Sequence, residues 1–422
     1  MPGSLRQWLD TLESRHPVAI DLGLERCGRV YRNLGAPLPA TTVFTVAGTN
    51  GKGSVVAFLG RLLGAAGMRW GTYTSPHILR FNERISLGGS AVSDRRLVAA
   101  LEEVEGARQG ESLTYFEFTT LAALRVLQTA ELDAAVLEVG LGGRLDAVNL
   151  VSADYAILTR IGLDHQEHLG PDRESIGFEK AGILRAGRPV VCGDRDPPAS
   201  VLRQSEELGA PLYRLGGEFE VAREAEGLRF VLGRQSLHLP LPGLAGSHQY
   251  ENLATAMAAL LVAFPELDAR AESLGPAIRA TSLPGRLQRS ELDRRVVLDV
   301  GHNPLAALAI AEYLSSEGSG RRFCVLGMLA DKDAEGVAAT LAPLIDSWYC
   351  ASLPGARGQS GSELAARVRR AHPEARVQSA DSVATALATA RKAAKAADTI
   401  MVCGSFATVA AALDALRSVK PQ

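Results

Sequence analysis

The chain has 422 residues, of which 46% are hydrophobic and 22% are charged, and its formal net charge is −2. This length exceeds the size at which a single hydrophobic core stops growing, so we expect two folded domains. The near-neutral charge, with basic residues scattered along the chain, argues against nucleic acid or an anionic membrane as a partner. No stretch approaches twenty uninterrupted apolar residues, and the first residues lack the order of a signal peptide, so we expect a cytoplasmic protein.

The N-terminal segment predicts a short helix over residues 5–12, and residues 20–34 lead into the first strand. Five cysteines lie far apart in the chain, mostly in apolar runs typical of strands. This spacing predicts reduced, buried thiols and does not fit a zinc site or a disulfide framework. The cysteines are Cys27, Cys192, Cys324, Cys350 and Cys403.

The pattern of residues 42–59 predicts a strand, a tight loop and a helix. An apolar, β-branched run ends at a loop with three glycines, and a second apolar run follows. Glycines let a backbone approach phosphate oxygens closely, and this loop contains Gly48, Gly51 and Gly53. The lysine among them and the first amides of the helix supply fixed positive charge to an anion. We therefore predict a phosphate-binding loop.

Lys52 and Ser54 are the reactive side chains of this loop. The Lys52 ammonium can face phosphate oxygens, and the Ser54 hydroxyl can reach a phosphate-bound magnesium ion. The loop departs from the common pattern because Gly53 separates Lys52 from Ser54. A glycine-rich turn with a solvated lysine is the alternative interpretation at this point.

Four further apolar runs predict parallel strands that alternate with helix-like segments, at residues 70–74, 134–139, 155–159 and 189–192. Ligands of open α/β sheets bind beyond the carboxyl ends of strands. Ser75, Glu138 and His165 all occupy such positions, as does the loop of Lys52. We therefore expect four separate segments to face one crevice. The polar segment 80–84, by contrast, is too mixed for a core.

Glu138 ends an otherwise apolar strand, where a carboxylate must be solvated, paired or bound to a cation. With Ser75 and phosphate oxygens it would form an all-oxygen magnesium site. A strand-end glutamate that accepts backbone amides is the alternative. Imidazole is not a preferred magnesium ligand, so Asp164 or His168 could replace His165, and a structural histidine is equally consistent with the pattern.

Residues 219–239 predict a small antiparallel excursion, and residues 251–264 predict an alanine-rich helix. Turn residues follow at 283–286, so we place a domain boundary there, with domains at 1–284 and 285–422. The second domain alternates strand and helix without a glycine-rich dinucleotide fingerprint, which predicts another doubly wound α/β domain. Its predicted strands are residues 296–299, 322–327, 348–351, 375–378 and 399–403.

Three more positions could carry chemistry. Lys180 alone would be interpreted as a surface lysine of a helix. Asp299, His302 and Asn303 cluster at a strand end, a pattern more often functional than structural, although Asn303 could simply cap a helix. Arg286 could bind a phosphate or pair with a carboxylate.

Six segments taken together resemble the folylpolyglutamate synthase branch of the Mur ligase family. They are residues 48–54 (GTNGKGS), 75–77 (SPH), 137–147, 179–183, 283–286 and 302–304. The resemblance covers nearly the whole chain, including C-terminal runs at 327–333, 348–351 and 402–406. It implies an α/β fold with two doubly wound, Rossmann-like domains: an N-terminal P-loop ATPase domain of Mur ligase type and a smaller C-terminal domain.

The resemblance also implies an activity. A member of this branch is an ATP-dependent ligase that joins L-glutamate to 7,8-dihydropteroate and adds further glutamates to reduced folates, through an acyl phosphate, with ADP and phosphate as products. The implied cofactors are two magnesium ions and a monovalent cation, with ATP as co-substrate. The implied assembly is a monomer.

Residue roles carried over from the family fall on matching positions. ATP would be bound by Thr49, Asn50, Gly51, Lys52, Gly53, Ser54, Asn252, Arg286 and Asp299. Magnesium would be bound by Ser75, Glu138 and, at a second site, His165. The pterin substrate would be bound by Asp21, Leu22, Gly23, Leu24, Thr114, Tyr115, Phe116, Glu117, Leu145, Asp146 and Ala147. Glutamate would be bound by His302 and Ser405.

The implied catalytic residues are Lys52, Lys180, His165 and His302. Lys180 matches the family lysine that carbon dioxide carbamylates, a change that replaces a cation with an anionic oxygen ligand. Two departures are visible: Gly301 stands where alanine is usual, and Ala407 stands where relatives often have histidine. The second departure weakens any detailed description of the glutamate pocket.

Two other classes of protein remain as alternatives. A Mur-type amino-acid ligase acting on another carboxylate, such as a nucleotide-linked cell-wall precursor, would share the crevice but should carry an extra N-terminal domain. Only about 40 residues precede the phosphate loop, too few for such a domain. A non-catalytic, nucleotide-switched binding protein would share the loop without needing Ser75, Glu138 and His165 to converge.

Overall fold

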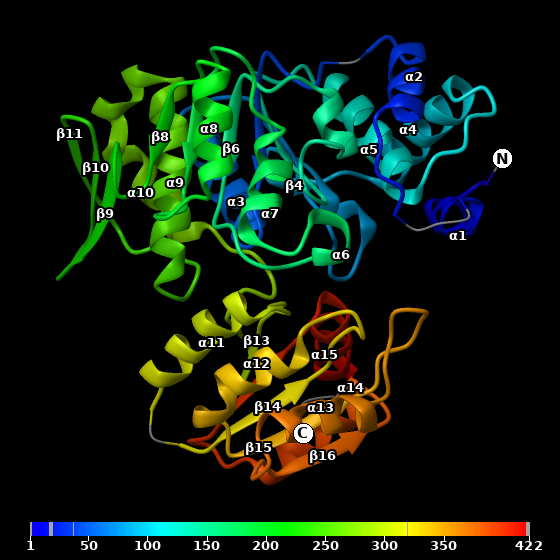
Figure 1. Cartoon of the computed structure of the whole chain (residues 1–422), viewed down its shortest axis with the longest axis vertical. Helices are drawn as coiled ribbons and strands as arrows, with labels where there is room; N and C mark the ends of the chain where they lie inside the picture. Colours follow the sequence, from blue (N-terminus) through cyan, green and yellow to red (C-terminus); the bar gives the residue numbers. More distant parts are fainter. Residues whose placement is uncertain (1, 17–19, 37, 319, 419–422) are drawn as a thin grey trace. The chain divides into compact units, whose positions relative to one another are not determined.

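The computed structural model describes residues 2–16, 20–36, 38–318 and 320–418. The chain divides into two compact units (Figure 1). Unit 1 comprises Met1–Gly243 and Tyr250–Thr281, and unit 2 comprises Leu244–Gln249 and Ser282–Gln422. The boundary between residues 284 and 285 that the turn residues suggest stays a prediction. No helix among the described residues is both long and apolar enough to cross a bilayer.

Unit 1 is built on an eight-stranded sheet in the order β4-β3-β2-β5-β1-β6-β7-β8. All pairings from β2 to β8 are parallel, and β3 and β4 form an antiparallel extension. The parallel strands are largely apolar because helices cover both faces of the sheet. The strands are β1 (Thr42–Ala47), β2 (Trp70–Tyr73), β3 (Ile85–Leu87), β4 (Ser90–Ala91), β5 (Ala134–Glu138), β6 (Tyr155–Leu158), β7 (Val190–Cys192) and β8 (Leu212–Arg214).

Helices cover both faces of this sheet. One core cluster packs α1, α2, α4, α5, α7 and α8 against Val43, Ala135 and Leu137. Side chains alternate along a strand, so Phe44 and Val136 point to the opposite face, and α3 contacts β1, β2 and β5. The helices are α1 (Leu5–Arg15), α2 (Glu25–Asn33), α3 (Lys52–Ala65), α4 (Asp94–Ala107), α5 (Tyr115–Gln128), α6 (Gln166–Leu169), α7 (Arg173–Ala181), α8 (Ala199–Glu207), α9 (His248–Ala263) and α10 (Ala271–Ala280). Short 3-10 turns are η1 (Phe81–Arg84), η2 (Ala147–Leu150) and η3 (Pro265–Arg270).

Two local expectations differ from the structure. The helix after the phosphate loop begins at Lys52, before the expected apolar run, because Gly51 caps it in a left-handed conformation with φ 95°. The segment 80–84 is not wholly excluded from the core, since Phe81, Asn82 and Arg84 are buried. The guanidinium of Arg84 lies over aromatic rings, which lets a charged side chain enter an apolar region.

The antiparallel excursion and the second α/β domain are both confirmed. The excursion is a three-stranded sheet of β9 (Phe219–Glu224), β10 (Gly227–Leu232) and β11 (Gln235–Leu239). Unit 2 contains a six-stranded sheet in the order β12-β13-β17-β14-β15-β16, parallel except at β12. Its strands are β12 (Gln288–Arg289), β13 (Val296–Leu298), β14 (Arg322–Leu326), β15 (Ser347–Ala351), β16 (Val377–Ala380) and β17 (Thr399–Cys403).

Helices of unit 2 alternate with these strands, as a doubly wound domain requires. They are α11 (Pro304–Ser316), α12 (Ala334–Leu341), α13 (Gly361–Ala371), α14 (Val383–Ala393) and α15 (Phe406–Ser418), with a 3-10 turn η4 (Ala342–Leu344). The strand predicted at residues 375–378 is displaced by two residues, since β16 spans Val377–Ala380. All five cysteines are free and buried, as their spacing predicts.

Candidate active site

The sheet order of unit 1 brings the predicted catalytic segments together. Strands β2, β5, β1 and β6 are consecutive neighbours, and being parallel they end at the same edge. Ser75 follows β2, Glu138 ends β5, the loop of Lys52 follows β1, and His165 follows β6. The chain reaches these strands in a different order, so their proximity depends on crossover connections.

The phosphate loop is held close to its neighbours by glycines. A Cβ atom on Gly48 would lie 1.8 Å from the Thr159 hydroxyl oxygen, and one on Gly51 would lie 2.5 Å from Asn252 Oδ1. The Thr49 amide donates to the Arg160 carbonyl at 2.9 Å, which ties the loop to the end of β6. Asn252, on α9, therefore lies against the loop, although its sequence position is two hundred residues away.

Two lysines converge on one carbonyl of this loop. Lys52 Nζ donates to the Gly48 carbonyl at 3.1 Å and to the Thr49 carbonyl at 3.3 Å. Lys180 Nζ donates to the same Gly48 carbonyl at 2.9 Å. The Lys180 residue is only 4% exposed, which excludes the surface-lysine interpretation. Burial, followed by repulsion from Lys52, lowers the pKa of Lys180 to about 7, while Asp164 and Asp146 oppose this change.

Glu138 and Ser75 lie side by side. The Ser75 amide donates to Glu138 Oε2 at 3.2 Å, and Glu138 is 5% exposed. Glu138 thus accepts a hydrogen bond from a backbone amide. This contact is the one expected of the alternative interpretation, in which Glu138 is a structural glutamate at the end of a strand. A carboxylate and a neighbouring serine are also residue types that suit a hard divalent cation, so the observed backbone contact is compatible with both interpretations.

His165 occupies a strained turn at the end of β6. It caps α6 in the left-handed conformation with φ 51°. Its amide donates to Asp164 Oδ1 at 2.9 Å, and its Nε2 lies 3.9 Å from the same oxygen. Asp164 acts electrostatically on Lys180, whereas His168 lies 3.3 Å from Glu167. The choice among these side chains as a metal ligand stays a prediction.

The loop after β5 buries a second acid. Asp146 accepts the amides of Leu141 at 2.8 Å and Val148 at 2.9 Å and is 3% exposed. Burial raises the pKa of Asp146 to about 6, against the effect of those amides and of Lys52. Arg144 anchors the same loop to α7 by donating to Glu179 at 2.8 Å.

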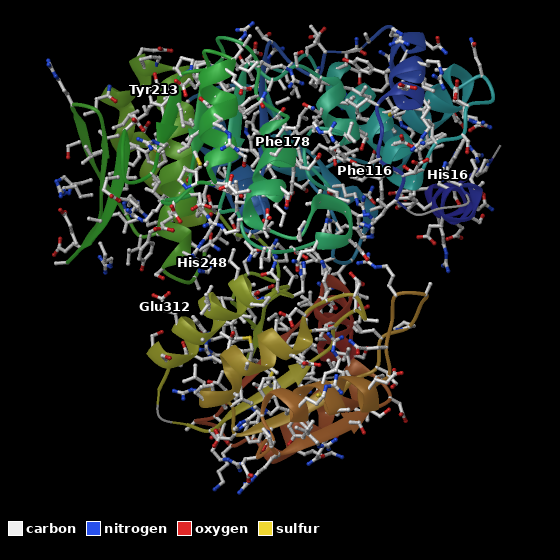
Figure 2. The ribbon with its side chains drawn as sticks, in the orientation of Figure 1. His16, Phe116, Phe178, Tyr213, His248 and Glu312 are labelled. Atoms are coloured by element: carbon white, nitrogen blue, oxygen red, sulfur yellow. The ribbon has the colours of Figure 1, made fainter. Side chains whose placement is uncertain are left out.

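The three segments assigned to the pterin lie at or next to neighbouring elements of unit 1, since α2, which follows residues 21–24, α5 and η2 contact one another pairwise. Thr114 and Glu117 form a capping box at the start of α5. Phe116, labelled in Figure 2, packs against the end of β5, because a Cβ atom on Gly140 would lie 2.5 Å from its ring. Burial, then the charge of Glu117, raises the pKa of the Cys27 thiol between these segments well above its usual value.

Arg26 connects two of these segments, although no sequence motif identified it. Its guanidinium pairs with Asp21 and donates to Glu117 Oε2 at 3.0 Å. Its NH2 group also donates to the Asp21 carbonyl at 2.6 Å. The Glu117 side chain is only 5% exposed, so Arg26 is the counterion of a buried carboxylate. The only sequence signal is an arginine five residues after an acid, which is too common to be informative.

Replacing Arg26 with methionine should destabilise unit 1 by about 3 kcal/mol, because the buried Glu117 carboxylate would lose its counterion. Chemical denaturation measures this loss. Arg29→Met is the matched control, since Arg29 pairs with Glu111 at the surface. Equal stability of the two variants would contradict the structural role of Arg26.

Residues of unit 2 assigned to ATP also lie close together. Asp299 Oδ2 accepts the Leu287 amide at 2.9 Å, and Asp299 Oδ1 accepts the Gly301 amide at 2.7 Å. The guanidinium of Arg286 lies over the Phe406 ring, 5.4 Å from its centroid. Asp299 therefore fixes the turn that carries Arg286 against the carboxyl end of β13.

The two residues assigned to glutamate follow neighbouring strands of unit 2. The Gly404 amide donates to the Gly301 carbonyl at 2.9 Å, which joins the loops that carry Ser405 and His302. His302 Nδ1 lies 3.0 Å from the Val300 carbonyl. Asn303 caps α11, so the structural alternative for this amide is confirmed.

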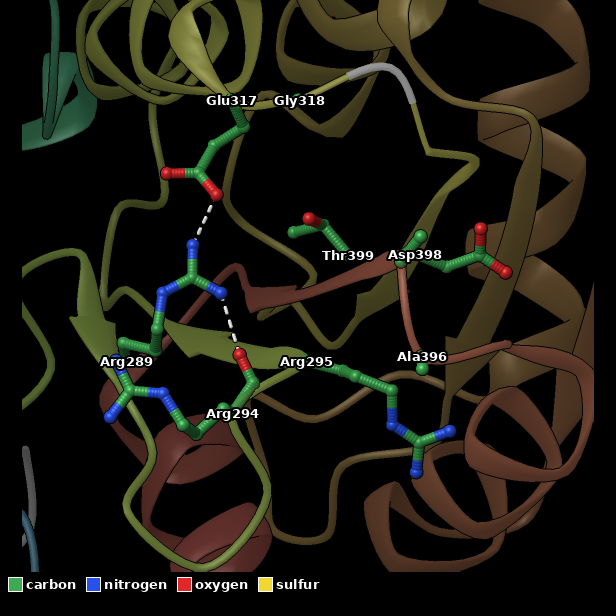
Figure 3. A pocket seen from close by; sticks show the side chains of 9 residues that line it. Arg289, Arg294, Arg295, Glu317, Gly318, Ala396, Asp398 and Thr399 are labelled. Carbon is green, nitrogen blue, oxygen red and sulfur yellow. Dashed lines mark hydrogen bonds and ion pairs between the residues drawn. The ribbon is translucent and has the colours of Figure 1, made fainter.

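Figure 3 shows a cavity of unit 2 lined by three arginines. It lies at the amino ends of the strands, because Thr399 begins β17 and Arg295 precedes β13. Arg289 pairs there with Glu317, and Arg295 pairs with Asp293 at 2.8 Å. Since ligands of open α/β sheets bind at the carboxyl ends, this cavity is distinct from the candidate active site.

Comparison with known families agrees with this geometry. Residues 46–260 match the Mur ligase middle domain, and residues 285–406 match the Mur ligase glutamate ligase domain. The two matched segments contain the phosphate loop and the Asp299 to Ser405 cluster, respectively. The chain therefore belongs to the Mur ligase family.

Individual relatives confirm the narrower resemblance drawn from the motifs. The chain is 44% identical over 418 residues to the dihydrofolate synthase/folylpolyglutamate synthase of Escherichia coli (strain K12), covering 98% of this chain and 95% of the relative. It matches the structure of E. coli FolC in complex with DHPP and ADP with a TM-score of 0.91 and 42% identity over 99% of both chains. A bifunctional folylpolyglutamate synthase/dihydrofolate synthase structure with Mn, AMPPNP and L-glutamate bound matches with a TM-score of 0.90 and 42% identity over 98% of both chains.

Proposed function

We propose that this protein is an ATP-dependent ligase that joins L-glutamate to 7,8-dihydropteroate and adds further glutamates to reduced folates. The observation that carries the proposal is the meeting of the phosphate loop, Lys180 and Glu138 at one sheet edge. The chain that forms this edge is also 44% identical, over 418 residues, to a relative named dihydrofolate synthase/folylpolyglutamate synthase. A Mur-type ligase acting on another carboxylate substrate is the alternative.

The chemical obstacle is that a carboxylate does not react with an amine. Its oxygen is a poor leaving group, and its negative charge repels nucleophiles. In the proposed mechanism the substrate carboxylate attacks the γ-phosphorus of ATP, forming an acyl phosphate and releasing ADP. The glutamate amine then attacks the acyl carbon, so that phosphate leaves, the amine loses a proton and an amide bond forms.

The phosphate loop would provide the electrostatic part of this reaction. Its glycines keep the backbone close to the β- and γ-phosphates, and the amides at the start of α3 donate to them. The Lys52 ammonium neutralises charge that spreads over the transferred phosphoryl group. Ser54, which is 1% exposed in the first turn of α3, would bind a phosphate-bound magnesium ion through its hydroxyl.

Ser75 and Glu138 would hold one magnesium ion, and His165 a second. When bound, such ions supply charge neutralisation at the phosphates and at the developing oxyanion. The buried Glu138 carboxylate beside the Ser75 loop is the feature that supports the first site. A monovalent cation is proposed from the resemblance alone.

Lys180 would be carbamylated. In this reaction the neutral amine attacks carbon dioxide and loses a proton, which yields an anionic carbamate. A pKa of about 7 gives a substantial neutral fraction near neutral pH. The carbamate would also replace the repulsion between two ammonium groups at the Gly48 carbonyl by attraction to Lys52. Charge and burial thus both favour the modification.

The remaining assignments are proposals on the same basis. Asn252, Arg286 and Asp299 would contact ATP, and His302 and Ser405 would contact glutamate. The segments at residues 21–24, 114–117 and 145–147 would hold the pterin. Domains at 1–284 and 285–422, a monomeric state and a cytoplasmic location complete the proposal; the free cysteines are consistent with a reducing compartment.

Incubation with ATP, magnesium, dihydropteroate and labelled glutamate tests the proposed function. We expect labelled dihydrofolate and ADP in equal amounts, and no ADP when dihydropteroate is omitted. ADP formation with a cell-wall precursor in place of the pterin would favour the alternative ligase. Nucleotide binding without turnover on either substrate would indicate a non-catalytic protein.

A further inference from the structure

Arg84 is a buried cation beside the candidate active site. The residue is 8% exposed, and its guanidinium carbon lies 5.2 Å from the Phe81 ring centroid and 5.7 Å from that of Tyr115. Its Nε donates to His77 Nδ1 at 3.0 Å. Both distances fall within the range of cation–π attraction, so the two rings stabilise the guanidinium at this position.

The groups around Arg84 do not neutralise it. Within the described ranges the structure records no ion pair between Arg84 and a carboxylate. The acid closest in sequence, Glu83, instead accepts the backbone amides of Ile78, Leu79 and Arg80 at 2.8, 3.0 and 2.7 Å, respectively. His77 accepts this hydrogen bond through the lone pair of Nδ1, so it contributes no negative charge to Arg84. A buried, uncompensated guanidinium is costly, which points to an anion supplied by a ligand.

The position of Arg84 indicates which ligand. The Thr74 amide donates to the Arg84 carbonyl at 2.8 Å, so Arg84 lies beside the loop that carries Ser75. Tyr115, which covers the guanidinium, begins α5 next to Phe116 in the segment assigned to the pterin. Arg84 therefore lies between the proposed pterin segment and the strand end where phosphoryl transfer would occur.

We propose that Arg84 binds a carboxylate of the acyl substrate, an inference that rests on the proposed ligase function. Dihydropteroate has one carboxylate, which is the reacting group, whereas a reduced folate also carries the non-reacting α-carboxylate of its glutamyl residue. Either carboxylate would receive a charge-assisted, two-pronged pair of hydrogen bonds from the terminal nitrogens of Arg84. The aromatic rings would exclude water and strengthen that pair.

Steady-state kinetics of Arg84→Met tests the proposal with both acyl substrates. We expect the KM for the acyl substrate to rise about 10- to 100-fold, the usual range for losing hydrogen bonds to a charged group, while the KM for ATP stays unchanged. A rise for both dihydropteroate and tetrahydrofolate identifies the reacting carboxylate as the partner. A rise for tetrahydrofolate alone identifies the α-carboxylate.

Arg80→Met is the matched control. Arg80 lies four residues away in the same segment, is exposed and pairs with Asp94 at 3.3 Å. If Arg84→Met fails to fold, Arg84→Lys keeps the charge, and Arg84→Ala with added methylguanidinium tests for rescue. Unchanged KM values for both acyl substrates, or a rise in the KM for ATP alone, would overturn the proposal. A wild-type protein that ligates neither substrate would instead overturn the proposed function.

Discussion

Replacing Lys52 with alanine should reduce ADP formation by at least about a thousandfold, because preorganised positive charge at a transferring phosphoryl group is worth that much. The fold should remain intact, since among the residues that the structure describes the Lys52 ammonium donates only to the carbonyls of Gly48 and Thr49 in its own loop. A coupled ADP assay measures the rate, and thermal unfolding measures the integrity of the fold.

Lys392→Ala provides the control for this experiment. Lys392 is an exposed lysine in the last turn of α14, and its removal should leave turnover unchanged. Normal turnover of Lys52→Ala would remove the assignment of residues 48–54 as the phosphate loop. Loss of turnover together with unfolding would show that Lys52 has a structural role the observed contacts do not explain.

The second large effect is expected at Lys180. Lys180→Ala should lower the rate of ligation by about a hundredfold or more, because the proposed carbamate would be the anionic group beside the phosphate loop. The deleted side chain would leave space at the Gly48 carbonyl, so acetate or bicarbonate should partly restore activity. Rate measurements with increasing acetate would show saturable rescue. Kinetics equal to wild type would show that Lys180 takes no part in the reaction.

The pKa of Lys180 gives this expectation a pH dependence. Because the pKa lies at about 7, the neutral amine that reacts with carbon dioxide predominates above pH 7 and is lost as the pH falls below it. Protein depleted of carbon dioxide should therefore regain activity faster at pH 8 than at pH 6, at equal dissolved carbon dioxide. Equal recovery at the two pH values would argue against carbamylation.

Features that depend on residues adjacent in the chain could be predicted from the sequence. Apolar runs predicted the parallel strands, because strands buried on both faces have no polar side. The glycines around Lys52 predicted a turn with close backbone approach, and Gly51 indeed adopts a positive φ. Ser75, Glu138 and His165 could be placed near strand ends because each lies at the end of an apolar run or a few residues after it.

The environment of individual charges, by contrast, depends on how distant segments pack. Lys180 lies in a helix whose pattern resembles a surface helix, yet its ammonium is buried against Gly48, 132 residues away in sequence. Arg84 was expected in a polar segment too mixed for a core, yet it is buried, and Arg26 had no local signal. Burial and ion pairing depend on the crossover connections that bring distant segments together, and a local pattern carries no information about which segment will cover a given side chain.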